Sequence, residues 1–245
     1  MIKQHLRYNI PDDINAKLWR YLELSKLEIL LKSKTLYFCR SDLFEDQHEG
    51  TYTKNALEYR KYFYAEASDN WLNNTMPHIN LNWKKCTFIS CWHVNNNEDV
   101  NMWRAYSKEG KLIVIESTIL KLKNSISDIE STFLLGLINY IDYQTDLISE
   151  ANAFAPFFNK RKEFSGEREF RIIKERVVDI DNVIAGKITM PTGVNISIVP
   201  ELLIKKIIIS PFADANYSKK VIKVLKKYDI LKKLERSALK TSPIY

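Results

Sequence analysis

The amino-acid sequence predicts an α+β fold, in which a mixed, largely antiparallel sheet is flanked by helices in a single domain over residues 1–245. Three observations support this class. Apolar strand-like runs such as 112–115 occur together with segments of helical periodicity. The last part of the chain is strand-like at 203–210, helical at 214–228 and extended at 230–237, which is the order of a crossover unit. The chain has only six glycines, which argues against a sandwich or barrel rich in tight turns.

The other elements follow from the spacing of apolar residues and from capping signals. Helices are expected at 16–32, at 53–73, after the cap Asp99 and at 147–162, the last interrupted by Pro156. Strands are expected at 36–39, 86–92, 112–115, 133–143 and 169–174. The sequence contains no internal repeat, low-complexity tract or Pro/Gly/Ser-rich linker that would mark a domain boundary.

The composition indicates a globular chain with basic character. Hydrophobic residues make up 45% and charged residues 27%, and the formal net charge is +7. A positive net charge favours polyanionic partners such as nucleic acid or a nucleotide. The three cysteines argue against a disulfide framework, and no apolar run approaches the roughly 18 residues of a membrane span. With no signal-like apolar core near Met1, we expect a cytoplasmic protein without a membrane partner.

Two glutamates, one residue apart, stand at the head of an apolar, strand-like run. On a strand Glu167 and Glu169 would share one face, while Phe170 and Ile172 would take the other. Two like charges side by side repel unless a cation, a metal or a proton separates them. Two interpretations stay open: a catalytic carboxylate pair, or a solvated strand edge neutralised by arginines such as Arg171.

Acidic residues in the segment 41–50 offer an alternative, a metal-dependent nuclease. Together with Glu167 and Glu169, four loop carboxylates could hold magnesium: Asp42, Glu45, Asp46 and Glu49. The lysine expected next to the strand carboxylate is missing, so this stays the minority interpretation. We expect the loop to border the same cleft as the glutamate pair. Some of its carboxylates should cap backbone amides or pair with arginines such as Arg40 or Arg104.

Other catalytic and metal-binding motifs are missing from the sequence. Cys86, Cys91 and His93 lie close together, but their spacing matches no common zinc pattern, and we predict no metal site. The sequence has no Gly-rich phosphate loop of the Walker or dinucleotide type, and no Gly-x-Ser-x-Gly elbow. These absences argue against ATPase, Rossmann and serine-hydrolase chemistry.

Five short motifs, in their order along the chain, resemble one known family. They are Leu36-Tyr37-Phe38, the loop Ser-Asp-Leu-Phe-Glu-Asp-Gln-His-Glu-Gly at 41–50, Phe88-Ile89-Ser90-Cys91-Trp92, Met102-Trp103-Arg104-Ala105-Tyr106 and Glu167-Arg168-Glu169-Phe170-Arg171. Over residues 18–237 the chain resembles the bacterial domain-of-unknown-function 2971 family, which is similar to the abortive-phage-resistance protein AbiGi. Gln47 stands where the family usually has Pro, and Phe170 where it has an aromatic such as Trp.

The resemblance implies a cytoplasmic, toxin-like effector of bacterial anti-phage defence with an ADP-ribosyltransferase-like core. Such enzymes use an arginine at the end of an early strand, a hydroxyl residue on a second strand and a Glu-x-Glu on a third. Carried onto this chain, these are Arg20 or Arg40, then Ser90, then Glu167 with Glu169. The substrate would be NAD, and ADP-ribose would pass to a nucleic-acid or protein target.

The chemistry of NAD cleavage explains these residue types. Glu169 would hold a ribose hydroxyl and stabilise the oxocarbenium-like transition state, and Glu167 would orient or deprotonate the acceptor. Ser90 would brace the carboxylate or the ribose. An arginine would clamp the pyrophosphate. Arg40 is favoured over Arg20, because Arg40 ends a strand and Arg20 lies in a helical pattern.

Three aromatic residues are candidates for stacking on nicotinamide, with core packing as the alternative: Trp92, Trp103 and Tyr106. The alternative to a transferase or a nuclease is a non-catalytic protein whose basic surface binds nucleic acid or a phage component. If Glu169 is a solvated catalytic residue, Glu169→Gln should abolish activity and change stability by under about 0.5 kcal/mol.

Overall fold

The computed structural model describes residues 2–4, 10–107, 109–175, 182, 187 and 189–240, and the chain divides into two compact units. Unit 1 comprises Met1–Ile10, Phe38–Ser90 and Glu130–Val194. Unit 2 comprises Pro11–Tyr37, Cys91–Ile129 and Asn195–Tyr245. Because these segments alternate along the sequence, the chain passes from one unit to the other five times.

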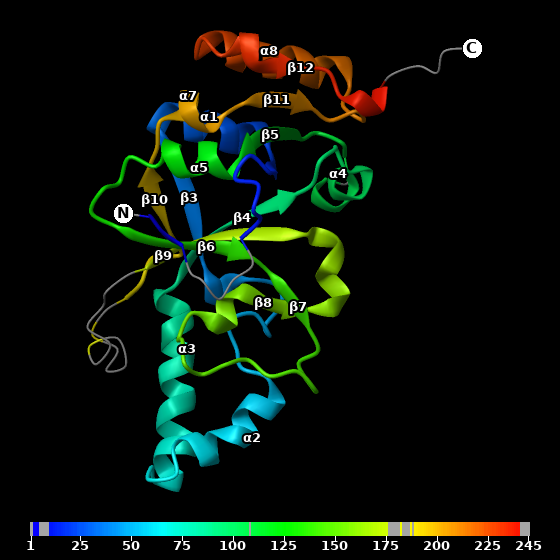
Figure 1. Cartoon of the computed structure of the whole chain (residues 1–245). Helices are drawn as coiled ribbons and strands as arrows, with labels where there is room; N and C mark the ends of the chain where they lie inside the picture. Colours follow the sequence, from blue (N-terminus) through cyan, green and yellow to red (C-terminus); the bar gives the residue numbers. More distant parts are fainter. Residues whose placement is uncertain are drawn as a thin grey trace. The chain divides into compact units, whose positions relative to one another are not determined.

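Both units combine helices with strands, and most strand pairs are antiparallel (Figure 1). The predicted α+β class, with a mixed and largely antiparallel sheet, is therefore confirmed. The single domain over 1–245 stays a prediction. Three strands begin in one unit and end in the other: β3 (Thr35–Arg40), β4 (Phe88–Val94) and β10 (Gly193–Ser197).

Unit 1 is built around β9. Its strands, besides parts of β3, β4 and β10, are β1 (Ile2–Gln4), β6 (Thr132–Leu137), β7 (Asn139–Ile141), β8 (Asn159–Arg161) and β9 (Glu169–Glu175). β6 runs antiparallel to β9, with Leu135 opposite Ile172, and β1 runs parallel to β6. On its other side β9 neighbours β4, which pairs with β3. β7 and β8 form a separate parallel pair.

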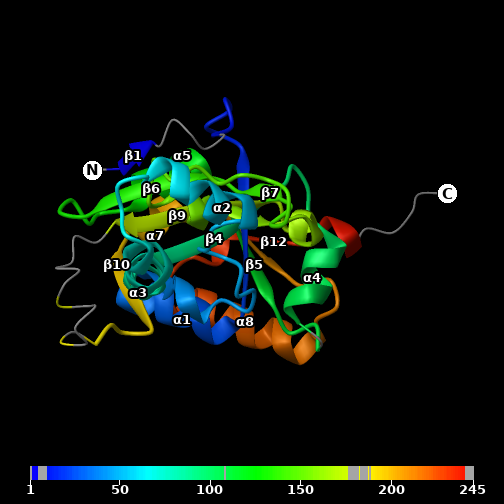
Figure 2. The same ribbon diagram turned by 90° about the horizontal axis from the view of Figure 1, so that it is seen from below.

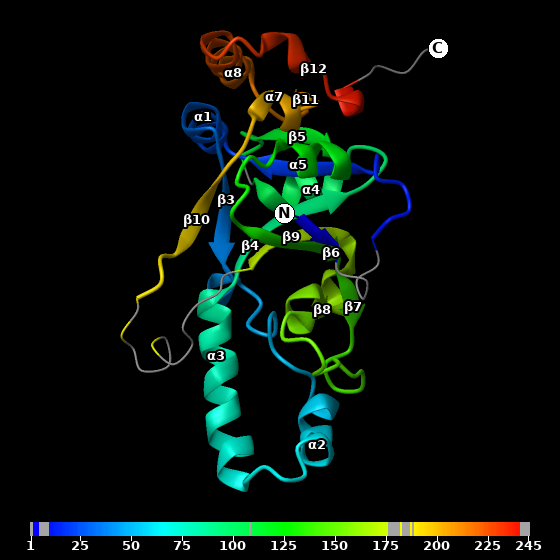
Figure 3. The same ribbon diagram turned by 60° about the vertical axis from the view of Figure 1, so that its left-hand side comes forward.

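The helices of unit 1 are mostly short, apart from a helical hairpin that extends from the strands (Figure 3). The hairpin consists of α2 (Lys54–Phe63), the π-helical η2 (Trp71–Thr75) and α3 (Met76–Cys86). The described residues of unit 1 also form three 3-10 helices: η1 (Ser41–Leu43), η3 (Ala155–Phe158) and η4 (Lys162–Glu167). Thr53 caps α2 by accepting a hydrogen bond from the amide of Ala56.

The core of unit 1 confirms the prediction that Phe170 and Ile172 share one face of a strand. Phe170 and Ile172 of β9 are both fully buried. They share a face with Phe133 of β6, whose ring lies 5.9 Å from that of Phe38 on β3. The alternate residues of β9, which begin with Glu169, therefore point to the opposite face.

Unit 2 contains the predicted crossover. Its further strands are β2 (Lys17–Leu22), β5 (Ile113–Thr118), β11 (Lys206–Ile209) and β12 (Leu234–Glu235). Its helices are α1 (Leu24–Ser33), α4 (Val100–Tyr106), α5 (Ile119–Ser125), α7 (Pro200–Leu203), α8 (Ala215–Lys227), η5 (Leu231–Lys233) and η6 (Ala238–Lys240). β5 lies between β2 and β11, antiparallel to both. β12 returns parallel to β11 after α8, which confirms the strand, helix, strand order.

Three of the predicted helices are not continuous helices. Residues 16–32 form β2 followed by α1, and 147–162 contain η3, β8 and the first residue of η4. The segment 53–73 contains α2 and the start of η2, with non-helical residues 64–68 between them. β2 lies between β4 and β5, and four of its six residues are buried. A strand with buried residues on both faces has no strict alternation, so its apolar residues imitate helical spacing.

In the part of the chain that the structure describes, no helix combines the length and the apolar character needed to span a bilayer.

We predict that Asp214→Ala destabilises the protein by about 1 kcal/mol, because Asp214 is the N-cap of α8. Its carboxylate accepts a 2.6 Å hydrogen bond from the amide of Tyr217. Urea denaturation of Asp214→Ala and of the exposed control Asp12→Ala measures the difference. An unchanged free energy of unfolding in Asp214→Ala would contradict this role.

Candidate functional site

Arg171 of β9 lies at the centre of a buried ion-pair network in unit 1. Its side chain is 1% exposed. Nε and Nη2 donate to the two carboxylate oxygens of Glu169, at 2.7 and 3.0 Å, and Nη2 also donates to Glu49. Nη1 donates to the carbonyl of Phe157 at 2.8 Å. The guanidinium therefore links β9, the 41–50 loop and η3, and such bidentate contacts are among the stronger hydrogen bonds in proteins.

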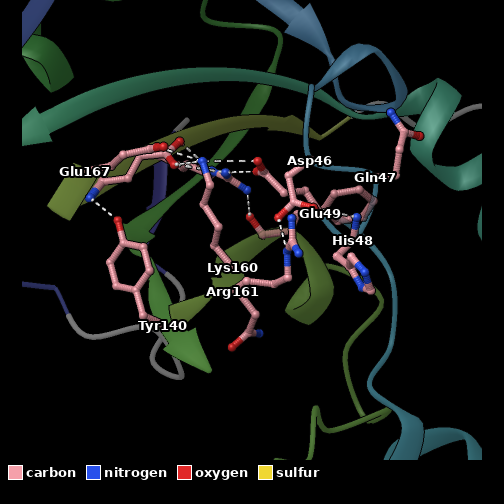
Figure 4. A network of polar contacts seen from close by, with 12 residues as sticks. Asp46, Gln47, His48, Glu49, Tyr140, Lys160, Arg161 and Glu167 are labelled. Carbon is pink, nitrogen blue, oxygen red and sulfur yellow. Dashed lines mark hydrogen bonds and ion pairs between the residues drawn. The ribbon is translucent and has the colours of Figure 1, made fainter. Parts of the chain in front are cut away.

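Lys160 of β8 brings a third glutamate, Glu167, close to Glu49 and Glu169. Its Nζ lies 2.7 Å from Glu167, 3.2 Å from Glu49 and 3.5 Å from Glu169, measured to the nearest carboxylate oxygens (Figure 4). We call Arg171, Lys160, Glu49, Glu167 and Glu169 the carboxylate network. Its three carboxylates face two cations, so it carries one net negative charge.

The two glutamates of the sequence motif meet in an unexpected way. β9 begins only at Glu169, whereas Glu167 is the last residue of η4. Between them Arg168 has a left-handed backbone with φ of +41°. The prediction that both share one strand face is therefore wrong, because the chain turns at Arg168 before the strand begins. Lys160, rather than the pleat, holds the two carboxylates together.

The 41–50 loop contributes to the network as expected. Asp46 accepts a hydrogen bond from the amide of His48 at 3.1 Å and pairs with Arg161 at 3.1 Å (Figure 4). The next residue after Glu49 is Gly50, with φ of +74°. A Cβ there would lie 2.6 Å from the ring of Phe157, so only glycine fits beside η3.

Three of the four loop carboxylates, Asp42, Asp46 and Glu49, thus pair with cations or cap amides, as expected. Asp42 pairs with Arg40 at 2.6 Å. Arg104, the other expected partner, instead lies 5.7 Å from the ring of Phe212.

Burial and neighbouring charges shift the pKa values of the residues in the network. Burial alone would lower the pKa of Lys160, but the nearby charges of Glu169, Glu49 and Glu167 outweigh it and raise that pKa. Burial raises the pKa of Glu167, aided by repulsion from Glu169 and Glu49 and opposed by the bond to Lys160. Burial also raises the pKa of Tyr140, whose hydroxyl accepts the amide proton of Glu169 at 2.8 Å.

Exposure distinguishes the three glutamates of the carboxylate network. The side chain of Glu167 is 35% exposed, against 7% for Glu169 and 5% for Glu49. Glu167 is therefore the carboxylate that a solute can reach, whereas Glu169 and Glu49 are buried below it. Its pKa is raised, so it is a stronger proton acceptor than an ordinary glutamate.

Arg40 and Ser90 lie on strands near β9 but do not join the network. Arg40 stands opposite Phe88 in the β3–β4 pair, so Arg40, Phe88 and Ser90 share one face. This is the face on which Phe38 meets Phe133, opposite to that of Glu169. Ser90 is 1% exposed. The fork of Arg40 donates to Asp42 and to the carbonyl of Met190 at 2.6 Å.

Arg20 and its neighbours belong to unit 2. Arg20 lies on β2 rather than in a helix, donates to the carbonyl of Tyr37 at 3.2 Å and stacks 5.5 Å from the ring of Trp92. Burial lowers its pKa, and Cys91 and Tyr106 partly oppose this shift.

The three predicted stacking aromatics also belong to unit 2. Trp92 and Trp103 are each 1% exposed, and the indole of Trp103 donates to Glu98 at 3.2 Å. Trp103 meets Tyr21 edge-on at 5.0 Å, and Tyr106 stacks on Tyr21 at 5.6 Å. Core packing accounts for the two tryptophans. Tyr106 is 54% exposed and is the aromatic that a ligand can reach.

No group of three or more His, Cys, Asp or Glu side chains is arranged as a metal site within the described residues. Between the carboxylates of the network lies the ammonium of Lys160. A pocket of about 720 Å³ lies in the helical hairpin, lined by Phe63, Tyr64, Ala65, Glu66, Ala67, Ser68 and Trp71. It contains none of the predicted site residues.

Sequence reasoning identified both glutamates but not the central role of Lys160 and Glu49. Lys160 appears in the sequence only as one of three consecutive basic residues, 160–162. Glu49 is one of four loop carboxylates, and the glycine that follows it is the single local signal that sets it apart.

No protein-family model, curated protein or solved structure matches this chain. The resemblance to the domain-of-unknown-function 2971 family therefore stays a prediction.

We predict that Glu169→Gln lowers the free energy of unfolding by about 3 kcal/mol, because it removes one carboxylate from the buried Arg171. This replaces the earlier expectation of under about 0.5 kcal/mol, which assumed a solvated residue. Urea denaturation of Glu169→Gln and of the exposed control Glu163→Gln, from η4, measures the difference. Equal stability of the two variants would show that the Arg171 pair contributes little.

We also predict opposite pH dependences for two carboxylates. The pKa of Asp46 is lowered from 3.8, mainly by Arg161 against the effect of burial, so its contribution to stability is lost as pH falls below about 4. The pKa of Glu167 is raised from 4.5, so the native state binds more protons and stability falls as pH rises through the interval above 4.5. Asp46→Asn should remove the first slope and Glu167→Gln the second. Urea midpoints from pH 3 to 8 test both, and unaltered slopes would contradict the assignments.

Proposed function

We propose that this chain is a cytoplasmic anti-phage effector that transfers ADP-ribose from NAD to a nucleic-acid or protein target. One observation carries the proposal. Glu167, an accessible carboxylate with a raised pKa, lies 2.7 Å from Lys160 above two buried glutamates. Perturbed carboxylates with a specific charge partner are typical of acid–base sites.

The reaction uses this arrangement as follows. The bond between C1′ of the ribose and the nicotinamide nitrogen breaks, and the electron pair leaves with nicotinamide. The acceptor oxygen or nitrogen bonds to C1′, and its proton passes to Glu167. The net negative charge of the carboxylate network favours the oxocarbenium-like transition state. Glu169 acts as a positioning residue, because Arg171 holds both its oxygens.

Arg161 is the arginine best placed to meet a pyrophosphate beside Glu167. Its side chain is 37% exposed, and its guanidinium lies 5.2 Å from the ring of Phe164, a residue of the same η4 helix as Glu167. Nε of Arg161 donates to Asp46, and the other N–H groups of the guanidinium can donate to a phosphate. The guanidinium of Arg40 already donates hydrogen bonds to Asp42 and to a backbone carbonyl. We therefore favour Arg161 over Arg40 as the arginine that binds the pyrophosphate.

A second candidate function is a non-catalytic protein that binds nucleic acid or a phage component. The hydrogen bonds of Arg171 favour this second candidate. Its guanidinium donates to two carboxylates and a carbonyl, so the network also has a purely structural role in holding these segments together. A metal-dependent nuclease has less support, since Lys160 lies between the carboxylates that would bind the metal.

We predict that Glu167→Gln lowers the rate of nicotinamide release from NAD by 10²- to 10⁴-fold, the usual contribution of an acid–base group. Glutamine keeps the shape and a hydrogen bond to Lys160, so the fold should persist. The matched control is Glu163→Gln, which removes one charge from the same η4 helix.

The readouts are release of nicotinamide and protection of cells against phage. Loss of both in Glu167→Gln, with both retained in Glu163→Gln, supports the transferase. Full protection by Glu167→Gln at normal expression would overturn it and favour the non-catalytic protein.

A further inference from the structure

The outward face of α8 in unit 2 is strongly cationic. Five lysines of this helix are exposed, and no acidic residue occurs between Ala215 and Lys227: they are Lys219, Lys220, Lys223, Lys226 and Lys227. Figure 2 shows α8 lying beside α1, to which Lys227 connects it through a 2.7 Å ion pair with Glu28. We call Lys219, Lys220, Lys223 and Lys226 the α8 lysine face.

The opposite side of α8 is fully used by the fold. Tyr217, Val221 and Leu225 are 8%, 0% and 0% exposed. A basic amphipathic helix that lies on a bilayer must insert its apolar side among the lipids. Here that side is already buried in unit 2, so the lysines alone face solvent.

The α8 lysine face is not explained by stability. Lys219 and Lys223 are four residues apart, and Lys223 is three residues from both Lys220 and Lys226, so like charges are neighbours on the helix surface. Such pairs destabilise a helix by about 0.2–0.5 kcal/mol each.

No acidic side chain lies within ion-pair distance of these four lysines in the described residues. By contrast, the exposed Lys111 pairs with Glu109 and Lys206 with Glu235. Within the described residues, the repulsion on α8 is therefore not offset by ion pairs of these four lysines.

We propose that the α8 lysine face binds the phosphate backbone of nucleic acid without reading its sequence. The seven residue-to-residue steps from Lys219 to Lys226 rise by about 10 Å along the helix. Successive phosphates of one DNA strand advance by about 3.4 Å along the duplex axis, so this span covers about three such steps, which join about four phosphates. Lysine ammonium groups are flexible point charges, which suit backbone contacts rather than base recognition. The inference is independent of any role for Glu167.

The test compares two quadruple variants of the full chain, each with the same loss of charge. One is Lys219→Gln, Lys220→Gln, Lys223→Gln and Lys226→Gln. The control, spread over exposed positions of α2, α3 and α5, is Lys54→Gln, Lys61→Gln, Lys85→Gln and Lys123→Gln. Circular dichroism verifies that both retain the helical content of the wild type.

Fluorescence anisotropy with a labelled 20-base-pair duplex and a single-stranded RNA of equal length, at 50 to 200 mM salt, measures binding. Loss of four phosphate contacts should make the slope of log K against log salt shallower by about 3.6 for the duplex. The control should keep nearly all of the wild-type slope. Equal losses in both variants would overturn the proposal, because net charge alone would then explain binding. Binding of the wild type to phosphatidylserine vesicles but to neither oligonucleotide would overturn it as well.

Discussion

Unit 1 depends on the guanidinium of Arg171. Its donors reach Glu169 on β9, Glu49 in the 41–50 loop and the carbonyl of Phe157 in η3. Burying a guanidinium and two carboxylates is costly unless each is paired and hydrogen-bonded, and here every one of them is. Phe44 closes the site, with its ring 5.3 Å from the guanidinium. A lysine could not replace Arg171, since a single ammonium lacks the planar fork that meets both oxygens of Glu169.

The buried part of the carboxylate network sets the properties of its exposed part. Lys160 is held by Glu49 and Glu169, so its ammonium stays charged and fixed beside Glu167. Burial raises the pKa of Glu167 above its ordinary value, and the negative charges of Glu169 and Glu49 add to this shift. Preorganised sites require such an arrangement, in which buried ion pairs fix the position of one accessible group, here Glu167.

Local patterns in the sequence predicted elements well where one face of a strand or helix is buried. α8 has clear helical periodicity, and the cap at Asp99 and the burial of Phe170 and Ile172 were predicted correctly. β2 was mistaken for helix, because burial on both faces removes the alternation. The partners of Glu169 were beyond prediction, since Glu49 is 120 residues away in sequence and only the tertiary fold brings them together.

The alternation of the two units along the chain has a consequence for synthesis on the ribosome. β2 emerges early, but its partner β5 starts about ninety residues later, at Ile113, and β11 follows only at Lys206. At about 5–20 residues per second, the apolar side chains of β2 remain without their sheet neighbours for several seconds. Unit 1 includes residues up to Val194 and unit 2 residues up to Tyr245, so more than half of each is translated before either can close. Chaperones that shield extended apolar segments would therefore meet β2 in the interval before β5 emerges.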